Sequence, residues 1–317
     1  MRLPFSVKPS AATRFDVVGL GLNSIDLVAV VSEYPARNSK QRLERFERMP
    51  GGQAATAVSV CAALGWSASY IGRFGDDDLG ELSRTSLTSV GVDITRSKTV
   101  EGATNQFAVV IVDSSTGERT VLWQRHAGLT IDPGTVEHDA VTAGRVLIVD
   151  CLETAAAARA ARFAREAGSL TIVDVEKVRP RIGELLAHVD AIIASEQFPG
   201  EYTGYQSPGR ALQALADEFR APLVCMTLGR DGSLARCGGV EIRTPAFSVP
   251  CVDSTGAGDA FRGGFAAACL RAPEGEVEDA LLFANAVASL NCRRLGARGG
   301  IPTAGEVEQL LYASRNS

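Results

Sequence analysis

The sequence has no excess of basic residues and no continuous Lys/Arg-rich block. Its 32 Lys and Arg are outnumbered by 37 Asp and Glu, so the 317-residue chain carries a formal net charge of -5 at pH 7. Proteins bind nucleic acids and anionic membranes largely through clustered positive charge. The composition therefore excludes both as main partners and favours a small molecule as the ligand.

The chain also lacks long apolar segments. Its longest apolar runs are interrupted by glycine or charged residues, and they are shorter than the roughly 20 residues that a helix needs to cross a bilayer. The N-terminus lacks the basic and then apolar order of a secretory signal. With 45% hydrophobic residues, the sequence predicts a globular cytoplasmic protein in which residues 1–13 form a loose leader.

Residues typical of metal sites and disulfide frameworks are scarce. The three histidines are far apart in the sequence, and the seven cysteines show no C-x-x-C spacing. This excludes a zinc site and a disulfide framework, and we expect reduced, mostly buried thiols. The pattern G-x-x-x-x-G-K-[ST] is absent as well, which argues against a P-loop ATPase.

Apolar, β-rich runs alternate with alanine-rich runs through most of the chain. This alternation is typical of a parallel sheet covered by helices on both faces, and it predicts an α/β fold. The expected strands are 15–20, 69–72, 146–150, 171–175, 191–194 and 223–227. The expected helices are 54–64, 79–90, 154–167, 181–188, 209–219, 260–270 and 281–290.

Two segments interrupt this alternation, at about residues 27–48 and 103–124. Both show the period-two pattern of strands without an intervening helix, and residues 114–117 (SSTG) suit a turn. We expect two antiparallel hairpins that form a small sheet beside the main one. Neither an internal repeat nor a low-complexity linker divides the chain, so residues 1–317 are predicted to form a single domain.

The most informative stretch is residues 253–261 (DSTGAGDAF), which joins a turn of small residues to a helix. Gly256, Ala257 and Gly258 allow a ligand to approach the backbone closely at the start of that helix. The unpaired N–H groups of this turn, aided by the helix dipole, would stabilise a transferring phosphoryl group. Asp259 lies where it could accept a proton from an attacking hydroxyl. A flexible turn with Asp259 as a helix cap is the alternative.

This stretch resembles the C-terminal signature of the ribokinase, or PfkB, family of carbohydrate kinases, with Ser254 as a variation. The resemblance implies a ribokinase-like three-layer α/β/α domain, with a central, mostly parallel sheet and a small β-sheet lid. It implies a sugar as the acceptor, and ATP and Mg²⁺ as cofactors. It also implies that the two predicted hairpins form the lid, which covers the sugar and pairs two subunits into a homodimer.

A second resemblance lies at residues 51–57 (GGQAATA), which open an alanine-rich helix and expose free N–H groups to a ligand. From these residues alone, a helix start packed tightly on a strand is an equal alternative. Family members commonly have an asparagine that contacts sugar hydroxyls where this chain has Thr56, and threonine has less reach than an amide. The acceptor-binding residues that the resemblance implies here are Gly51, Gly52, Gln53 and Thr56.

Further acceptor contacts are expected from residues 19–26 (GLGLNSID), where a strand ends in an acid. Open α/β sheets bind ligands at the carboxyl ends of their strands, and a carboxylate accepts hydrogen bonds from the hydroxyls of a polyol. Asp26 matches the family's early sugar-binding aspartate, and Asn23 lies beside it. In the basic lid segment, Lys40 would pair with an anionic tail on the acceptor, or would only keep an exposed strand soluble.

The nucleotide pocket of the family resembles residues 227–232 (TLGRDG), which follow a predicted strand. The resemblance implies that Thr227, Gly229 and Gly232 contact ATP. It implies the same for Asn285 in a later helix and for Ser195.

Residues 296–302 (GARGGIP) resemble the loop that helps many family members to bind a monovalent cation. The K⁺ ligands that the resemblance implies are Asp253, Thr255, Gly296 and Gly300. The family's N-x-x-E element, which organises Mg²⁺ through water, would fall at residues 195–198 (SEQF), where neither key residue is present. Glu196 remains a candidate for a water-mediated contact with Mg²⁺.

Together these resemblances imply an ATP-dependent sugar kinase that phosphorylates a primary hydroxyl. Residues 173–177 (VDVEK) look ketohexokinase-like, and residues 53–57 (QAATA) are close to the corresponding block of the sulfofructose kinases. The expected acceptor is therefore a ketose or keto-sugar derivative, with or without a phosphate or sulfonate group. The alternatives are a nucleoside kinase of the same family and a catalytically silent protein that senses a sugar or nucleotide. An intact Asp259 argues against the silent protein.

Overall fold

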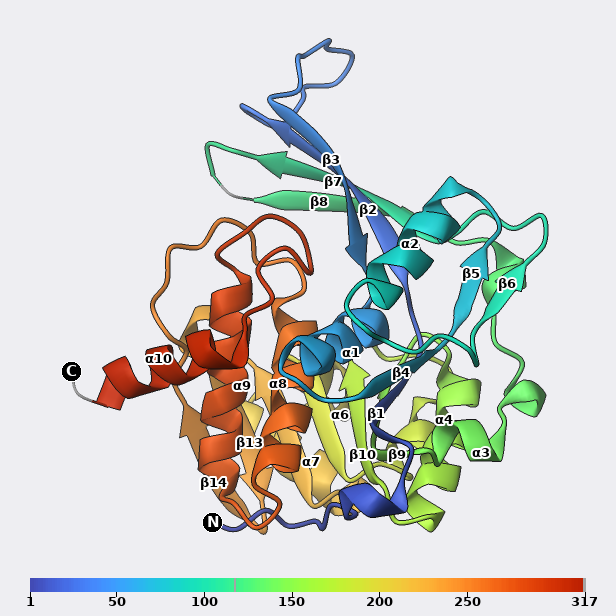
Figure 1. Cartoon of the computed structure of the whole chain (residues 1–317). Coiled ribbons are helices and arrows are strands. Elements are labelled where there is room, and N and C mark those ends of the chain that lie inside the picture. Colours follow the sequence, from blue (N-terminus) through green and yellow to red (C-terminus); the bar gives the residue numbers. More distant parts are fainter. Residues whose placement is uncertain (117, 316–317) are drawn as a thin grey trace.

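An eight-stranded sheet runs through the centre of the molecule in the order β14-β13-β12-β11-β10-β9-β1-β4 (Figure 1). The computed structural model describes residues 1–116 and 118–315. The strands are β1 (Phe15–Leu20), β4 (Ala68–Ile71), β9 (Gly144–Asp150), β10 (Leu170–Val175), β11 (Ala191–Ser195), β12 (Leu223–Thr227), β13 (Ser233–Cys237) and β14 (Val240–Thr244). Those from β12 across to β4 pair in parallel, whereas β13 and β14 add an antiparallel edge. The parallel strands are mostly apolar because both faces of the sheet are covered.

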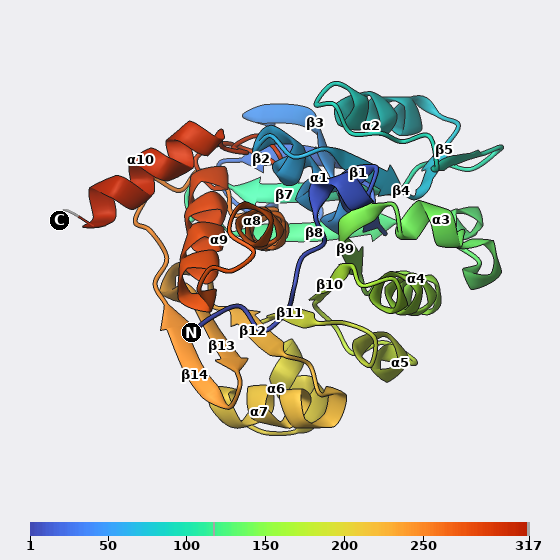
Figure 2. The same ribbon diagram turned by 60° about the horizontal axis from the view of Figure 1, so that its bottom comes forward.

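Helices cover both faces of this sheet (Figure 2). One face carries α1 (Gln53–Ala63), α8 (Ala257–Arg271), α9 (Val277–Asn291) and α10 (Ala304–Arg315). The other carries α3 (His138–Val141), α4 (Thr154–Glu166), α5 (Ile182–Leu186), α6 (Phe198–Thr203) and α7 (Pro208–Phe219). Adjacent strand residues alternate between the two cores, so that Ile148 packs on the α8 side and Leu147 on the α4 side. The predicted three-layer α/β/α fold is confirmed.

A second, four-stranded sheet projects from one end of the main sheet, in the order β3-β2-β7-β8 (Figure 1). Its strands are β2 (Ser24–Val31), β3 (Arg45–Gly51), β7 (Phe107–Asp113) and β8 (Arg119–Gln124). The pairs β2–β3 and β7–β8 are antiparallel, as predicted for the two hairpins, and the parallel pair β2–β7 joins them. Of the turn predicted at residues 114–117, Gly117 lies outside the described residues. We call this sheet the lid.

A smaller region beside the lid contains α2 (Asp78–Thr88) and the parallel strands β5 (Arg73–Gly75) and β6 (Lys98–Val100). Asp77 caps α2 by accepting a hydrogen bond from the N–H of Gly80 at 2.9 Å. Short 3-10 turns complete the connections: η1 (Ser10–Ala12), η2 (Ala127–Leu129), η3 (Pro133–Thr135) and η4 (Gly229–Asp231). Among the helices of the described residues, none is long and apolar enough to cross a membrane.

Some elements differ from the sequence predictions. Within the helix expected at residues 181–188, only α5 (Ile182–Leu186) is helical. It begins after Arg181, because that residue adopts a left-handed conformation with φ of 63°, outside helical geometry. Strands β13 and β14 have no counterpart among the predicted strands. The edge strand β14 is polar and largely exposed, so its sequence lacks the apolar run that marks the buried strands.

The N-terminal segment is packed on the core, and the predicted loose leader at residues 1–13 is therefore wrong. The backbone N–H of Leu3 donates to the carbonyl of Gly275 at 2.9 Å. The ring of Phe5 meets that of Phe265 on α8 edge to face, with centroids 6.3 Å apart. Leu3, Phe5 and Val7 all pack against the core between α8 and the sheet, since their period-two spacing turns them to one side of an extended chain.

This packing predicts that Phe5→Ala lowers the free energy of unfolding by about 2 kcal/mol, because the contact with Phe265 and the buried ring area are lost. Tyr205→Ala is the matched control, since that ring lies just after α6 and is 48% exposed. The control should change the free energy by less than about 0.5 kcal/mol. Urea unfolding followed by circular dichroism measures both, and equal effects would contradict the packed N-terminal segment.

Candidate active site

A cleft of about 310 Å³ opens between the lid and the main sheet. Leu22, Leu152 and Glu176 form part of its floor, and each lies just beyond the carboxyl end of a parallel strand. The lid contributes Asp26, and the start of α8 contributes Asp259. Ligands of open α/β sheets bind at this end of the strands. The fold thus brings the two predicted carboxylates from opposite parts of the sequence to one cleft.

The first turn of α8 borders this cleft with free N–H groups. The helix begins at Ala257, after Gly256, which adopts a φ of 73° and provides no side-chain cap. Ala257 donates to the carbonyl of Ser254 at 3.2 Å. Within the described residues, no acceptor binds the N–H groups of Gly256, Gly258 and Asp259. Because such donors cluster at the positive end of the helix dipole, the turn suits an anionic ligand.

Close packing explains why this turn contains two glycines. A Cβ on Gly256 would lie 2.5 Å from the carbonyl oxygen of Ala297, and the positive φ disfavours other residues as well. A Cβ on Gly258 would lie 2.4 Å from Nη1 of Arg262. The turn is therefore held from two sides, by the loop that contains Ala297 and by the Arg262 guanidinium.

Asp259 interacts with a second buried acid, Asp174. Burial raises the pKa of Asp259, whereas the charge of the Arg262 guanidinium and the interaction with Asp174 oppose this change. Burial likewise holds the pKa of Asp174 well above its usual range, against the opposing charge of Arg262. Two adjacent carboxyl groups resist simultaneous ionisation. A carboxylate with a raised pKa is a better proton acceptor, so Asp259 is suited to act as a general base.

The Arg262 side chain joins α8 to the main sheet. Its Nη2 lies 2.8 Å from Oδ1 of Asp174 on β10, and both side chains are 4% exposed. The same nitrogen donates to the carbonyl of Ile193 on β11 at 3.0 Å. This buried ion pair anchors the first turns of α8 directly under the cleft.

On the lid side, Asp26 is buried and faces the cleft. Burial raises its pKa to about 6, whereas the hydroxyl of Ser24 and the charge of Arg298 oppose this change. The Ser24 hydroxyl donates to Oδ1 at 3.2 Å, and a Cβ on Gly51 would lie 2.6 Å from Oδ2. Gln53 at the start of α1 also lines the cleft, together with Gly52. These groups can accept and donate hydrogen bonds to a polyol.

Two of the predicted acceptor residues have their polar groups occupied within the protein. The amide of Asn23 donates to the hydroxyl of Tyr70 at 3.0 Å and to the carbonyl of Arg73 at 2.8 Å. Thr56 is fully buried, and its hydroxyl accepts a hydrogen bond from Nε of Arg298 at 3.1 Å. Both side chains therefore support the walls of the cleft from behind and do not line it.

Lys40 is not brought to the cleft. It lies in the exposed loop between β2 and β3, which projects from the far end of the lid (Figure 1). The long strands of the lid carry this loop away from the sheet, and sequence spacing between Asp26 and Gly51 gave no measure of that distance. Within the described residues, the cations that line the cleft are instead Lys177 and Arg179.

The residues predicted to contact a nucleotide come from the end of β11, from β12 and the turn after it, and from α9. Gly229 and Gly232 adopt φ values of 56° and 84°, which form the turn after the strand. Thr227 and Ser195 lie partly buried at the ends of their strands. Asn285 is 4% exposed, and its amide donates to the hydroxyls of Ser233 and Thr244 at 3.1 and 3.0 Å. Its side chain thus supports β13 and β14.

The predicted cation loop lies beside the first turn of α8. Asp253 accepts hydrogen bonds from the N–H of Thr255 at 2.9 Å and from that of Gly296 at 2.8 Å. The amide of Asn291 donates to the carbonyl of Ala297 at 3.0 Å and to that of Thr255 at 3.5 Å. The carboxylate and carbonyl oxygens that could bind K⁺ lie together here, but they already accept hydrogen bonds from N–H groups of the protein.

The last two predicted metal ligands, Gly300 and Glu196, differ in their surroundings. Gly300 packs closely on Asn291, because a Cβ added to Gly300 would lie 2.1 Å from the carbonyl oxygen of Asn291. Glu196 is exposed and is not part of the cleft lining. Glu176 lines the cleft next to Asp259. Within the described residues, no group of three or more His, Cys, Asp or Glu side chains could hold a metal ion.

Two lid residues in the cleft escaped sequence reasoning. Gln106 is fixed because its side-chain oxygen accepts from Nη1 of Arg125 at 2.9 Å. Arg125 in turn pairs with the buried Glu153. Trp123 on β8 also lines the cleft and is 64% exposed. An exposed tryptophan in a predicted lid strand is the one signal that could have indicated a ligand contact.

Asp150 is a further buried acid that the sequence analysis did not single out. Its carboxylate accepts hydrogen bonds from the N–H of Leu22 at 2.6 Å and from that of Leu152 at 3.0 Å. Burial raises its pKa to about 6, and these N–H groups oppose the change. Asp150 thereby fixes the ends of β1 and β9 below the cleft. Its position as the last residue of a predicted strand was the available signal.

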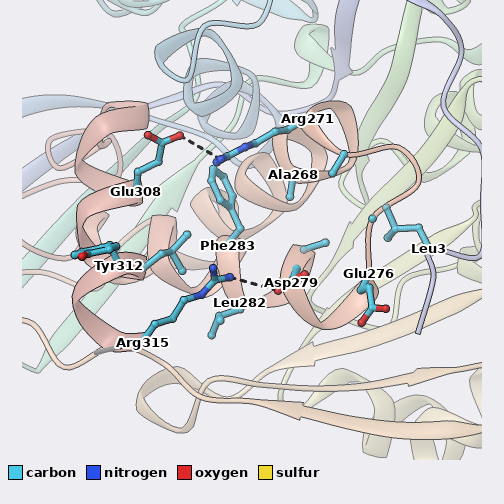
Figure 3. A pocket seen from close by; sticks show the side chains of 14 residues that line it. Leu3, Ala268, Arg271, Glu276, Asp279, Leu282, Phe283, Glu308, Tyr312 and Arg315 are labelled. Carbon is cyan, nitrogen blue, oxygen red and sulfur yellow. Dashed lines mark ion pairs between the residues drawn. The ribbon is translucent and has the colours of Figure 1, made fainter. Parts of the chain in front are cut away.

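A second hollow, of about 440 Å³, lies between α9, α10 and the N-terminal segment (Figure 3). Its walls are largely apolar and include Phe283. Ion pairs cross its rim, between Arg271 and Glu308 at 3.2 Å and between Arg315 and Asp279 at 3.7 Å. Because these charges are already paired and lie away from the carboxyl ends of the strands, we assign the chemistry to the cleft under the lid.

Comparison with known proteins gives consistent matches along the whole chain. Residues 14–304 match the model of the pfkB family carbohydrate kinases. The chain is similar to an ATP-dependent ribose-1-phosphate kinase from Halopiger xanaduensis, at 30% identity over 93% of this chain and 97% of that protein. It is also similar to fructokinase-1 from Zea mays, at 29% identity over 95% of this chain and 99% of that protein.

In fold, the chain is similar to the structure of Arabidopsis thaliana ribokinase complexed with ribose and ATP. The TM-score is 0.80 and the sequence identity 24%, over 94% of this chain and 98% of that structure.

The buried ion pair under the cleft predicts that Arg262→Leu lowers the free energy of unfolding by about 3 kcal/mol, because Asp174 loses its charged partner in a dry environment. Arg271→Leu at the other end of α8 is the matched control. Its ion pair with Glu308 is half exposed, and the loss should be under about 1 kcal/mol. Urea unfolding of both variants tests this, and a small effect for Arg262→Leu would refute the anchoring role.

Proposed function

The chain belongs to the pfkB family of carbohydrate kinases, and from that premise we propose that it transfers the γ-phosphoryl group of ATP to a primary hydroxyl of a ketose or a related monosaccharide. One observation carries the proposal. Asp259 adjoins the unpaired N–H groups at the start of α8, in the same cleft as Asp26. A base, an anion hole and a hydroxyl-binding carboxylate are the parts that this phosphoryl transfer requires.

In the proposed reaction, Asp26 accepts hydrogen bonds from the sugar hydroxyls and so orients the acceptor. Asp259 takes the proton from the attacking hydroxyl, and its raised pKa helps it to hold that proton. The N–H groups of Gly256, Gly258 and Asp259 stabilise the charge on the transferring phosphoryl group. Trp123 and the rest of the lid exclude water from the cleft.

The residues of the site fit an Mg²⁺ ion that binds together with ATP, and not an ion that the protein holds by itself. Glu176 lines the cleft and its negative charge raises the pKa of Asp259, so it would contact the ion directly or through water. Mg²⁺ commonly binds to substrate phosphates and only one or two carboxylates. It would supply the charge neutralisation that phosphoryl transfer requires.

Several features support a sugar as the acceptor. The similarity to a fructokinase favours a ketose, and the similarity to a ribose-1-phosphate kinase makes a pentose derivative the next substrate to test. An anionic tail on the acceptor gains no support from Lys40, which is exposed in the loop between β2 and β3. A nucleoside is the second candidate, because the exposed ring of Trp123 in the cleft could stack on a base.

Further parts of the proposal concern assembly and location. On the face turned away from the cleft, the lid exposes Leu122 on β8 and Phe46 on β3, at 57% and 52%. Burial of these side chains against a second lid would favour a homodimer. The seven cysteines are all unpaired, which suits the reducing cytoplasm where ATP is available.

The acceptor is best identified by coupled ADP release over a panel of ketoses, ribose 1-phosphate, other sugar phosphates and nucleosides. The proposal expects the highest kcat/KM for a monosaccharide or its derivative. A preference for nucleosides would select the second candidate. Absence of turnover with every compound, despite binding of ATP, would instead favour a catalytically silent sensor.

We expect Asp259→Asn to retain binding of ATP and sugar but to lose about 10² to 10⁴ in kcat, the usual contribution of a general base. Asp139→Asn, which alters an exposed acid on α3, is the matched control and should match the wild type. Isothermal titration gives the binding constants and the coupled assay gives kcat. Turnover of Asp259→Asn within tenfold of the wild type would contradict the assignment.

We also expect K⁺ to raise kcat several-fold. A cation beside Asp253 and the Gly296 to Gly300 loop would fix the first turn of α8 and add to its positive potential. The proposal rests on the carbonyls of Thr255 and Ala297, which converge on this loop. Rates are compared in K⁺ buffer and in tetramethylammonium buffer of equal ionic strength. Equal rates would rule out a cation at this loop.

A further inference from the structure

Arg298 has a buried guanidinium group that joins the lid to the helices beneath it. Its Nη2 donates to the carbonyl of Gly51 at 2.6 Å, its Nη1 to the hydroxyl of Ser86 at 3.1 Å, and its Nε to the hydroxyl of Thr56 at 3.1 Å. Gly51 is the last residue of β3, Thr56 lies on α1 and Ser86 on α2. Each of the three nitrogens of the guanidinium group therefore donates a hydrogen bond to a different element.

The loop that carries Arg298 also supports the anion hole. Ala297, the residue before Arg298, packs closely against Gly256. A Cβ added to Gly256 would lie 2.5 Å from the carbonyl oxygen of Ala297. On the lid side, Gly51 packs closely against Asp26. A Cβ added to Gly51 would lie 2.6 Å from Oδ2 of Asp26. A short chain of contacts thus runs from Asp26 through Gly51 and Arg298 to the first turn of α8.

Arg298 is also the cation that acts on Asp26. Its charge favours the ionised carboxylate, whereas burial and the negative charges of Asp259 and Asp253 oppose it. The residues that pair with Asp26 in the neighbouring strands β3 and β7 are Met49 and Ala108, which carry no charge. Burial lowers the pKa of Arg298 only to about 10, so its guanidinium remains charged at neutral pH.

We propose that Arg298 is a positioning residue that holds the hinge of the lid at Gly51 and keeps Asp26 ionised, so that the acceptor hydroxyls meet a charged carboxylate in register with the anion hole. The inference rests on the proposed function of Asp26 in acceptor binding. It also accounts for Thr56, whose hydroxyl fixes the orientation of the guanidinium and does not face the ligand. A carboxylate accepts hydrogen bonds from hydroxyls more strongly than a neutral carboxyl group does.

The kinetic test compares Arg298→Met, Arg298→Lys and Thr56→Val with the wild type. Arg298→Met removes the charge and all three hydrogen bonds. We expect its kcat/KM for the acceptor to fall about fivefold more at pH 6 than at pH 8, since a pKa increase of about one unit, from about 6, protonates most of Asp26 at pH 6 but little of it at pH 8. Its KM for ATP should change less than about twofold, because the nucleotide does not contact Asp26 in this proposal.

The other variants separate charge from geometry. Arg298→Lys keeps the charge but not the three-way geometry, so it should restore the pH dependence of the wild type while the acceptor KM stays elevated. Thr56→Val removes the hydroxyl that accepts the hydrogen bond from Nε of Arg298 but keeps the guanidinium charge. We therefore expect a smaller rise in the KM for the sugar, and this rise should not depend on pH. Arg294→Met alters an exposed arginine of the same region and should match the wild type.

A second measurement does not depend on turnover. The carboxyl resonance of Asp26 is followed by ¹³C NMR against pH in the free protein, with Asp26→Asn for the assignment. The midpoint should rise by about one unit in Arg298→Met. An unchanged midpoint in a folded Arg298→Met protein would overturn the inference, even if the kinase activity is real. Conversely, a raised midpoint in a protein without sugar kinase activity would refute only the proposed function.

Discussion

A helix N-terminus can stabilise a transferring phosphoryl group only while its N–H groups remain unpaired and fixed in direction. The rest of this structure depends on that constraint. Gly256 and Gly258 leave the first turn of α8 without a side-chain cap, and packing against Ala297 and Arg262 replaces the stability that a cap would give. Asp259 follows within the same turn, so the proposed base and the proposed anion hole share one support.

Burial of so many acids around one cleft requires opposing charge. Asp174 and Asp259 both experience desolvation, and Arg262 offsets it from below. Arg298 has the corresponding relation to Asp26 on the lid side. Because buried charges are costly unless paired and hydrogen-bonded, these arginines make the arrangement of carboxylates possible. The site is therefore a network of charges in which substitution of one member alters the others.

Sequence patterns predicted the layers of the fold. The alternation of apolar and alanine-rich runs predicted the parallel sheet, and the period-two segments predicted the lid hairpins. The stretch at 253–261 predicted a glycine turn at the start of a helix, and the role of Asp259 as a base stays a prediction. The patterns are ambiguous at two places: they predict a loose leader for the N-terminal residues with Phe5, which pack on the core, and they give no signal for the polar edge strand β14.

The sequence by itself determined those features that depend on residues close together in the chain, such as the turn before α8 and the acid at the start of the lid. Only the tertiary structure decided which polar side chains are free to meet a ligand. Asn23 and Thr56 are occupied by buried partners, whereas Gln106 and Trp123 reach the cleft. The reason is that a buried polar group must find a hydrogen-bond partner, and in this protein those partners come from strands and loops far away in the sequence.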